Sequence, residues 1–202
     1  KQTVNAPDGS VGSSQVASTI ITGQTAETSI ATDDTVLIHD TSAGALRKMT
    51  RANFVSGIGG DMTPAFYAYL SANQTIGHNA TTKVNCNTEV LDTDNAYDNS
   101  SNFRFTVPSG EAGKYFVYGA VRPNTSTDYE YSEAILRLSG TDKVSSTGRN
   151  IGRDSRVFAV TLDLSVGDYI ELFYYQDSGG DITVSGNATS HRTYFGAYKL
   201  II

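Results

Sequence analysis

The chain has 202 residues, of which 39% are hydrophobic and 18% are charged, and its formal net charge is −6. An acidic chain of this kind lacks the basic patch by which proteins bind nucleic acid. Its single cysteine, Cys86, excludes an intrachain disulfide framework and a cysteine-based metal site. No apolar run approaches the ~20 residues of a membrane-spanning helix, so we expect no membrane insertion. Nineteen glycines and many serines, threonines and asparagines indicate frequent turns and an all-β fold.

The first stretch, residues 1–28, is rich in serine, threonine, glycine, glutamine and alanine. Its few apolar residues follow no useful period, so the segment alone buries too little to offset its chain entropy. We therefore expect an extended anchoring segment that a partner protein holds in place.

Residues 29–60 predict a small module that begins with a β-hairpin. Val36–His39 and Leu46–Met49 are short strand-like runs, and Thr41–Gly44 between them has the residues of a turn. Thr50 then suits the N-cap of a short helix. The helix runs through Phe54 and Val55, and the hinge that ends it consists of Gly57, Gly59 and Gly60.

The sequence of this module, from Asp33 to Phe54, is D-D-T-V-L-I-H-D-T-S-A-G-A-L-R-K-M-T-R-A-N-F. It resembles a small module common in bacteriophage tail-fibre and other virion proteins. The resemblance implies a receptor-binding or trimerising domain downstream. The alternative is an isolated hairpin and helix within a linker.

From residue 61 to residue 202 the pattern is uniform: short strands separated by polar turns. Roughly nine to ten strands in one stretch suit a β-sandwich. The clearest expected strands are Ala65–Leu70, Lys83–Val90, Phe103–Val107, Lys114–Val121, Ser132–Leu138, Arg156–Leu164, Tyr169–Tyr175, Ile182–Val184 and Thr193–Ile202.

The closing strand has two apolar faces. Its alternation places Tyr194 and Tyr198 on one face, with Gly196 between them, and Phe195 and Ala197 on the other. A strand that is apolar on both sides is usually buried on both. One face can pack into the core of the domain, and the other then needs a second sheet or another copy of the chain. The alternative is an interior strand of an ordinary sandwich.

Several pieces of this region together resemble the globular head of complement first component subunit q and the related tumour necrosis factor superfamily. In order, they are P-A-F-Y-A-Y-L-S at Pro64–Ser71, Y-D-N-S-S-N-F-R-F-T-V-P at Tyr97–Pro108 with G-K-Y-F-V-Y-G at Gly113–Gly119, L-S-V-G-D-Y-I-E-L at Leu164–Leu172, and T-Y-F-G-A-Y at Thr193–Tyr198. The resemblance implies a ten-stranded antiparallel jelly-roll sandwich that forms a homotrimer. It also implies that Tyr194 and Tyr198 face the threefold axis, with Phe195 inside the sandwich.

No residue pattern points to a catalytic centre, a cofactor or a metal. Asp92, Asp94 and Asp98 lie close together but lack the ordered ligand spacing of a calcium loop, so a turn with Asx hydrogen bonds is favoured over a metal site. Asp177 and Asp181 receive the same interpretation. Cys86 is expected to pack as a small buried residue. The three histidines, which are scattered without ligand or catalytic spacing, are His39, His78 and His191.

One polar loop suggests a binding surface. Asn124–Tyr131 combines small polar residues with Tyr129 and Tyr131, a composition that suits contacts with sugars or protein surfaces. The alternative is a solvated turn.

The sequence as a whole predicts a trimeric virion protein, either a tail fibre or a head fibre that decorates the capsid. The N-terminal segment would bind a capsid or tail protein, and the outward jelly roll would contact a glycan or protein of the host surface. A secreted or cell-surface trimeric ligand of the complement and necrosis-factor class is the alternative. An enzyme is not expected, because no catalytic pattern is present.

Overall fold

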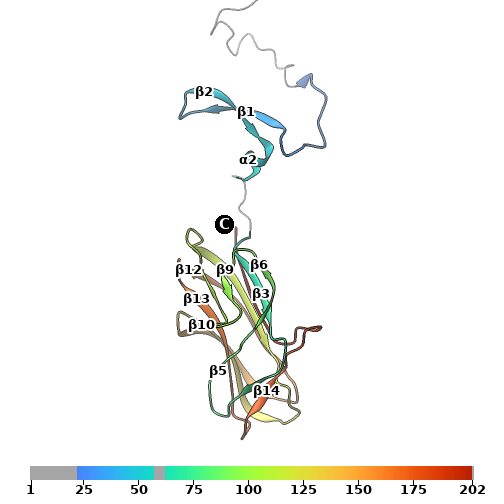
Figure 1. Ribbon diagram of the computed structural model, residues 1–202, viewed down its shortest axis with the longest axis vertical. Coiled ribbons are helices and arrows are strands. Elements are labelled where there is room, and N and C mark those ends of the chain that lie inside the picture. Colours follow the sequence, from blue (N-terminus) through green and yellow to red (C-terminus); the bar gives the residue numbers. More distant parts are fainter. Residues whose placement is uncertain (1–21, 57–61, 202) are drawn as a thin grey trace, which may run out of the picture. The chain divides into compact units, whose positions relative to one another are not determined.

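The computed structural model describes residues 22–56 and 62–201 (Figure 1). The chain divides into two compact units, Lys1–Gly59 and Gly60–Ile202, and each is described by itself. Most of the expected anchoring segment, residues 1–21, lies outside the described residues, as does the glycine hinge, residues 57–61. Within the described part of the chain, no helix has the length and apolar character needed to cross a membrane.

Residues 35–56 of the N-terminal unit form a hairpin followed by a short helix, as the sequence predicts. Strands β1 (Thr35–Asp40) and β2 (Ala45–Thr50) pair antiparallel, and α2 (Arg51–Ser56) follows directly. Gly44 turns the hairpin with a φ of +60°, a conformation that glycine adopts without strain. The Thr50 hydroxyl accepts a hydrogen bond from the Asn53 N–H at 3.3 Å, which confirms the expected helix cap.

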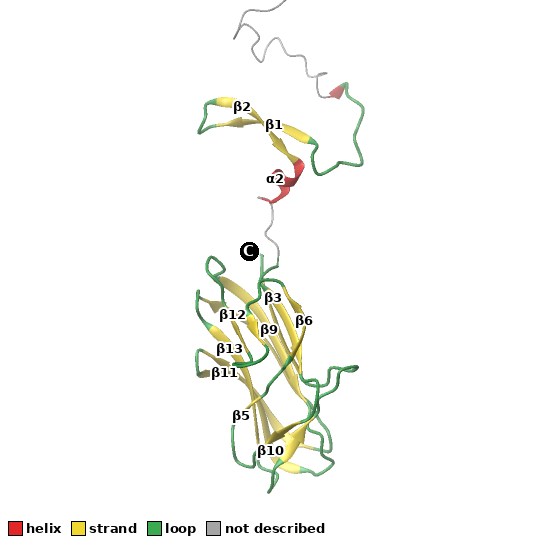
Figure 2. Ribbon diagram, viewed as in Figure 1, coloured by secondary structure: helices red, strands yellow, loops and turns green. Residues whose placement is uncertain are grey.

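The C-terminal unit contains two large antiparallel sheets (Figure 2). The first has five strands in the order β12-β9-β15-β3-β6, so the closing strand lies at its centre, between two strands from far earlier in the chain. The strands of this sheet are β3 (Ala65–Tyr69), β6 (Thr88–Asp92), β9 (Gly113–Val121), β12 (Arg156–Leu164) and β15 (Tyr194–Lys199).

The second sheet runs β11-β10-β13-β8-β7, and β5 also pairs with β13. A separate two-stranded ribbon joins β14 to β4. The strands of this sheet are β5 (Thr82–Lys83), β7 (Tyr97–Asp98), β8 (Arg104–Thr106), β10 (Tyr129–Leu138), β11 (Thr141–Asn150) and β13 (Tyr169–Gln176); those of the ribbon are β4 (Gln74–Ile76) and β14 (Ile182–Val184).

The core lies between the two sheets and is largely aromatic. Phe195 of β15 and Phe66 of β3 meet edge to face at 5.1 Å, and Phe66 stacks on Phe105 of the other sheet at 5.0 Å. These three side chains are at most 1% exposed. Aromatic pairs of this geometry add to the hydrophobic gain of burial, so the core ties the two sheets together. Cys86 is fully buried, as expected.

Three features differ from the prediction. The expected run Lys83–Val90 is wrong as one strand: the chain pairs with one sheet in β5, crosses the core through Val84 and Cys86, and joins the other sheet in β6. Strands β4, β7 and β11 were not expected. Because the described C-terminal unit has thirteen strands, β3 to β15, some of only two or three residues, the expected count of ten is not confirmed.

Candidate functional site

The closing strand β15 presents two tyrosines on the outer face of the five-stranded sheet. Phe195 and Ala197 point into the core, so Tyr194, Gly196 and Tyr198 point away from it. The two tyrosines are half-buried although they lie on the outside of the sheet. The predicted split of the two faces is therefore confirmed, and the outer one needs an explanation.

Gly196 lets aromatic rings from both neighbouring strands meet above the sheet. It lies opposite Tyr67 of β3 and opposite Tyr118 of β9. Those two rings approach to 6.4 Å with an interplanar angle of 20°. A Cβ added to Gly196 would lie 2.5 Å from Cζ of Tyr118. The absence of a side chain here is thus what allows the Tyr118 ring to lie over the central strand.

Other rings extend this contact along the sheet. Tyr194 lies 5.7 Å from Tyr67 and 6.3 Å from Tyr118, and Phe116 lies 5.5 Å from Tyr198 and 6.0 Å from Tyr118. All are half-buried. We call this set the aromatic face; it consists of Tyr67, Phe116, Tyr118, Tyr194 and Tyr198.

Aliphatic side chains continue the aromatic face to both edges of the sheet. Leu91 of β6 lies opposite Tyr67, and Val157 of β12 lies opposite Ala120, which is itself opposite Tyr194. Residues directly opposite one another share a face of the sheet. Leu91 is 47% exposed and Val157 is 54% exposed. An apolar surface therefore reaches across all five strands.

His191 lies beside the aromatic face on the segment before β15. Its ring stacks on Tyr69 at 3.9 Å, and its Nδ1 lies 3.3 Å from the Tyr67 hydroxyl. The backbone of His191 has a φ of +36°, an uncommon value for a residue with a side chain. The stacked ring thus fixes the local path of the chain next to the tyrosines.

Two phenols of the aromatic face, those of Tyr67 and Tyr118, have a raised pKa. Burial raises the pKa of Tyr67, and the neighbouring phenols of Tyr194 and Tyr118 raise it further. Burial, followed by Tyr198 and Tyr194, raises the pKa of Tyr118 in the same way. A neutral, partly desolvated aromatic surface of this kind is typical of the central part of a protein–protein interface.

The two loop tyrosines have different environments. Tyr129 is only 5% exposed, and its hydroxyl lies 3.1 Å from that of Tyr174 in the core, so its expected role on the surface is wrong. Tyr131 is 39% exposed and packs edge to face against Tyr175 at 5.8 Å. Its hydroxyl donates to Glu133 at 3.2 Å. Both tyrosines belong to β10, so the predicted loop ends before them.

The clustered aspartates accept hydrogen bonds from backbone N–H groups in turns, as expected from the sequence. Asp92 accepts hydrogen bonds from the N–H groups of Ala96 and Tyr97, both at 3.0 Å. Asp98 accepts from Ser101 at 2.8 Å and Ser100 at 3.0 Å, and these bonds hold the pKa of its carboxyl well below 3.8.

Asp177 and Asp181 also accept hydrogen bonds from the backbone, and the Cys86 thiol is buried. Asp177 accepts from the N–H of Tyr131 at 2.9 Å, and Asp181 accepts from the N–H of His78 at 3.0 Å. Burial raises the pKa of the Cys86 thiol. Among the described residues, no group of three or more potential ligands is placed to hold a metal ion.

Sequence reasoning found two members of the aromatic face and missed three. Tyr67, Phe116 and Tyr118 belong to strands that were predicted, and alternation already separated them from the core residues beside them. The missing information was the order of strands in the sheet, which places these residues next to β15.

No protein-family model matches the sequence, and a search of curated proteins gives no match. Among solved structures, the chain is similar to Eiger TNF from S. frugiperda, with a TM-score of 0.51 and 14% identity over 67% of this chain and 91% of that one. It is also similar to murine APRIL, with a TM-score of 0.52 and 16% identity over 67% of this chain and 98% of that one. At these identities the likeness concerns the fold alone: the chain contains an all-β, TNF-like jelly roll, which confirms that part of the predicted fold class, whereas the homotrimer and the N-terminal anchor stay predictions.

Proposed function

We propose that this chain is a non-enzymatic structural protein of a virus particle, which forms a homotrimer through its aromatic face and displays the jelly roll outward. The aromatic face carries the proposal. Five half-buried rings and two exposed aliphatic side chains share one sheet surface, and each leaves part of its area open to solvent. Single exposed apolar residues are common on proteins, whereas a contiguous patch marks an interaction site.

Self-association gives this surface a matching partner. Aromatic side chains bury about 150–250 Å² each, so covering the roughly one third of a ring that is still exposed contributes about 1–2 kcal/mol. Five rings in each of three copies together offer roughly 750–1,250 Å², and Leu91 and Val157 of each copy add further apolar area toward the ~2,000 Å² that obligate interfaces bury. Tyr194 and Tyr198 would then face the threefold axis, as the sequence resemblance implies.

The N-terminal residues are proposed to attach the trimer to the particle. The hairpin and helix take the form expected for the phage-type module, which supports this assignment. Residues 1–28 would serve as the anchor on a capsid or tail protein, and the glycines after α2 would serve as the hinge. Attachment to the head or to the tail fits equally well.

The jelly roll is proposed to contact the host surface through local polar and aromatic groups. The net charge, −6 per chain and three times that per trimer, opposes adhesion to an anionic envelope by bulk charge. Tyr131 with Tyr175 is the candidate contact, because this pair is accessible on β10 and β13. Three identical sites per trimer multiply weak contacts into useful avidity.

A second candidate is a secreted or cell-surface trimeric ligand. The observation that favours it is the fold, because the similar solved structures are Eiger TNF and APRIL. The two readings differ in where the protein is found. The virion reading predicts that an antibody against the chain labels intact virus particles, and that a chain without residues 1–60 still trimerises but is not incorporated.

A separate measurement tests host binding. Fluorescently labelled trimer should stain host cells and compete with particle adsorption. The Tyr131→Ala variant should stain them less, whereas Val166→Ala, which alters an exposed residue in a distant turn, serves as the matched control. If the trimer does not stain host cells and particles that lack the protein adsorb normally, only a decorative role on the shell would remain. If the antibody labels no virus particle, the virion proposal fails and the secreted or cell-surface ligand remains as the candidate.

A further inference from the structure

The described residues of the N-terminal unit form no core of their own. In residues 22–55 not one side chain is buried. The secondary structure of these described residues is a two-stranded hairpin and a six-residue helix, and an isolated hairpin is at best marginally stable in water. A hairpin and helix whose described residues bury no apolar side chain need another surface to cover them.

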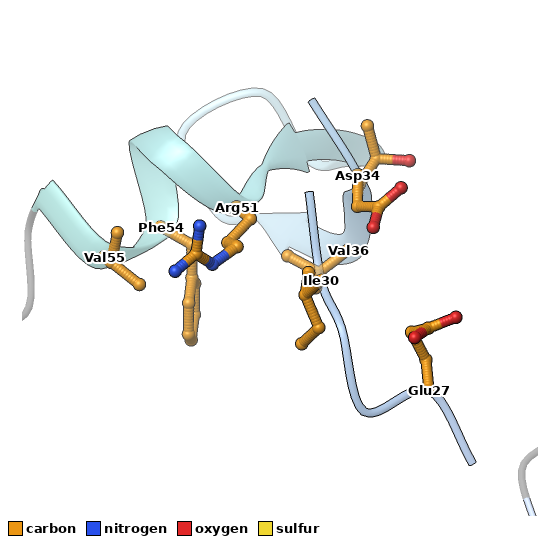
Figure 3. A pocket seen from close by; sticks show the side chains of 8 residues that line it. Glu27, Ile30, Asp34, Val36, Arg51, Phe54 and Val55 are labelled. Carbon is orange, nitrogen blue, oxygen red and sulfur yellow. The ribbon is translucent and has the colours of Figure 1, made fainter. Parts of the chain in front are cut away.

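An apolar groove in this unit is the surface that a partner would cover (Figure 3). It has a volume of about 650 Å³ and lies between the segment before β1, the start of β1 and the helix α2. Its apolar walls come from Ile30, Val36, Phe54 and Val55, which are 53%, 41%, 45% and 45% exposed. Figure 3 shows Ile30 and Phe54 pointing to the same side, with Arg51 between them.

The groove also carries charges of both signs. Arg51 lines it together with Glu27 and Asp34. Each carboxylate already accepts one backbone hydrogen bond, from Ser29 at 2.7 Å and from Ala31 at 2.8 Å respectively. No ion pair found in the described residues involves the Arg51 guanidinium. The groove can therefore accept an apolar partner that brings a carboxylate to Arg51 and a cation to Glu27 or Asp34.

We propose that the groove is filled by the N-terminal unit of a neighbouring copy, so that three such units associate into one shared apolar core. This inference rests on the proposed trimer. The same chain fits as the occupant because it offers apolar side chains and both charge signs. Interfaces around a threefold axis join two different patches of the same chain, so Arg51 of one copy can meet an acidic residue of the next.

The short connection between the two units of the chain favours the N-terminal unit of a neighbouring copy as the occupant of the groove. Eight residues, 57–64, join α2 to β3, and a chain of this length spans at most about 29 Å. The first residue of β3, Ala65, pairs with Tyr198 of the aromatic face. In the proposed trimer, the three connections therefore enter β3 next to the surface where the copies meet. A connection of only eight residues keeps the three N-terminal units close together, and the resulting high effective concentration favours their association with one another over outside partners.

Photo-crosslinking of the full chain tests the proposal. The photoreactive residue p-benzoylphenylalanine replaces Phe54 in one variant and Val55 in a second, and sedimentation equilibrium first establishes the mass of each. Irradiation of purified protein should join copies covalently, with the crosslink mapped by mass spectrometry to residues 22–56 of another copy. The matched control carries the same photoreactive residue at Leu37, which is 71% exposed and alternates to the other face of β1 from Val36; it should crosslink far less.

The outcomes separate this inference from the trimer itself. A trimer that shows no crosslink between copies at position 54 or 55 overturns the inference and leaves the trimer standing. Crosslinks to a capsid or tail protein in whole particles, without crosslinks between copies in purified protein, would also overturn it. A mass of a single chain would instead contradict the proposed function.

Discussion

Replacing Gly196 by alanine tests the packing of the aromatic face with the smallest possible change. The new Cβ would lie 2.5 Å from Cζ, 2.6 Å from the hydroxyl oxygen and 2.9 Å from Cε2 of Tyr118. All three separations are far below van der Waals contact, so the Tyr118 ring must move away from the strand. That ring also packs against Tyr67, Phe116 and Tyr194, and its movement disturbs the whole face.

The cost of this movement depends on what lies above the ring. In a single copy, Tyr118 can swing toward solvent, and the loss in folding free energy should be below about 1 kcal/mol. In a trimer, the ring is confined between copies, and overpacking of a confined side chain costs about 1–3 kcal/mol. Since all three copies carry the change, association should weaken by roughly 3–9 kcal/mol per trimer. Gly196→Ala should therefore affect assembly much more than folding.

Sedimentation equilibrium across a range of concentrations measures the association, and denaturant unfolding measures the folding. The matched control is Gly180→Ala, because nothing lies within 4 Å of a Cβ at Gly180. The control should assemble as the wild type does. If Gly196→Ala also assembles with unchanged affinity, the aromatic face does not join the copies and the reasoning is refuted.

Substitutions at four other residues probe the core, a turn and the two tyrosines of β10. Phe195→Ala removes a ring packed against Phe66 and should lower the free energy of unfolding by about 3–5 kcal/mol in a denaturant titration. Backbone N–H groups hold the pKa of Asp98 below its unfolded value of 3.8, so this carboxylate stabilises the fold above pH 3.8 and the contribution disappears as the pH falls. Asp98→Asn should therefore be less stable than the wild type near neutral pH, and the difference should shrink in acid; a difference that is constant with pH would contradict the assignment. Tyr129→Phe loses the contact with the Tyr174 hydroxyl and should cost about 1 kcal/mol of stability without changing host-cell staining. Tyr131→Ala should do the reverse, leaving the melting temperature unchanged and reducing the staining.

The features predicted correctly from the sequence are those fixed by local patterns. The hairpin of β1 and β2 follows from two apolar runs around a glycine turn, and the Thr50 cap follows from the residue type at the start of α2. The two faces of β15 follow from strict alternation, which needs no knowledge of neighbouring strands.

The features that were missed depend on contacts between distant segments. Strand β11 has a polar sequence and forms only because β10 provides a partner along its whole length. Tyr129 follows a polar stretch and resembles a loop residue, yet Tyr174, far away in the sequence, draws it into the core. Tyr67 and Tyr118 become neighbours only because Gly196 lies between their strands. Burial and strand order are properties of the assembled fold, and one sequence does not display them.

The mass of the intact chain in solution tests the central claim most directly, because the aromatic face was assigned to contact between three copies. Sedimentation equilibrium of the wild-type protein at micromolar concentration should give three times the chain mass of 21.6 kDa, with no change on moderate dilution. A soluble, folded species of 21.6 kDa at that concentration would contradict the account, since it would show that the aromatic face is stable while exposed to water.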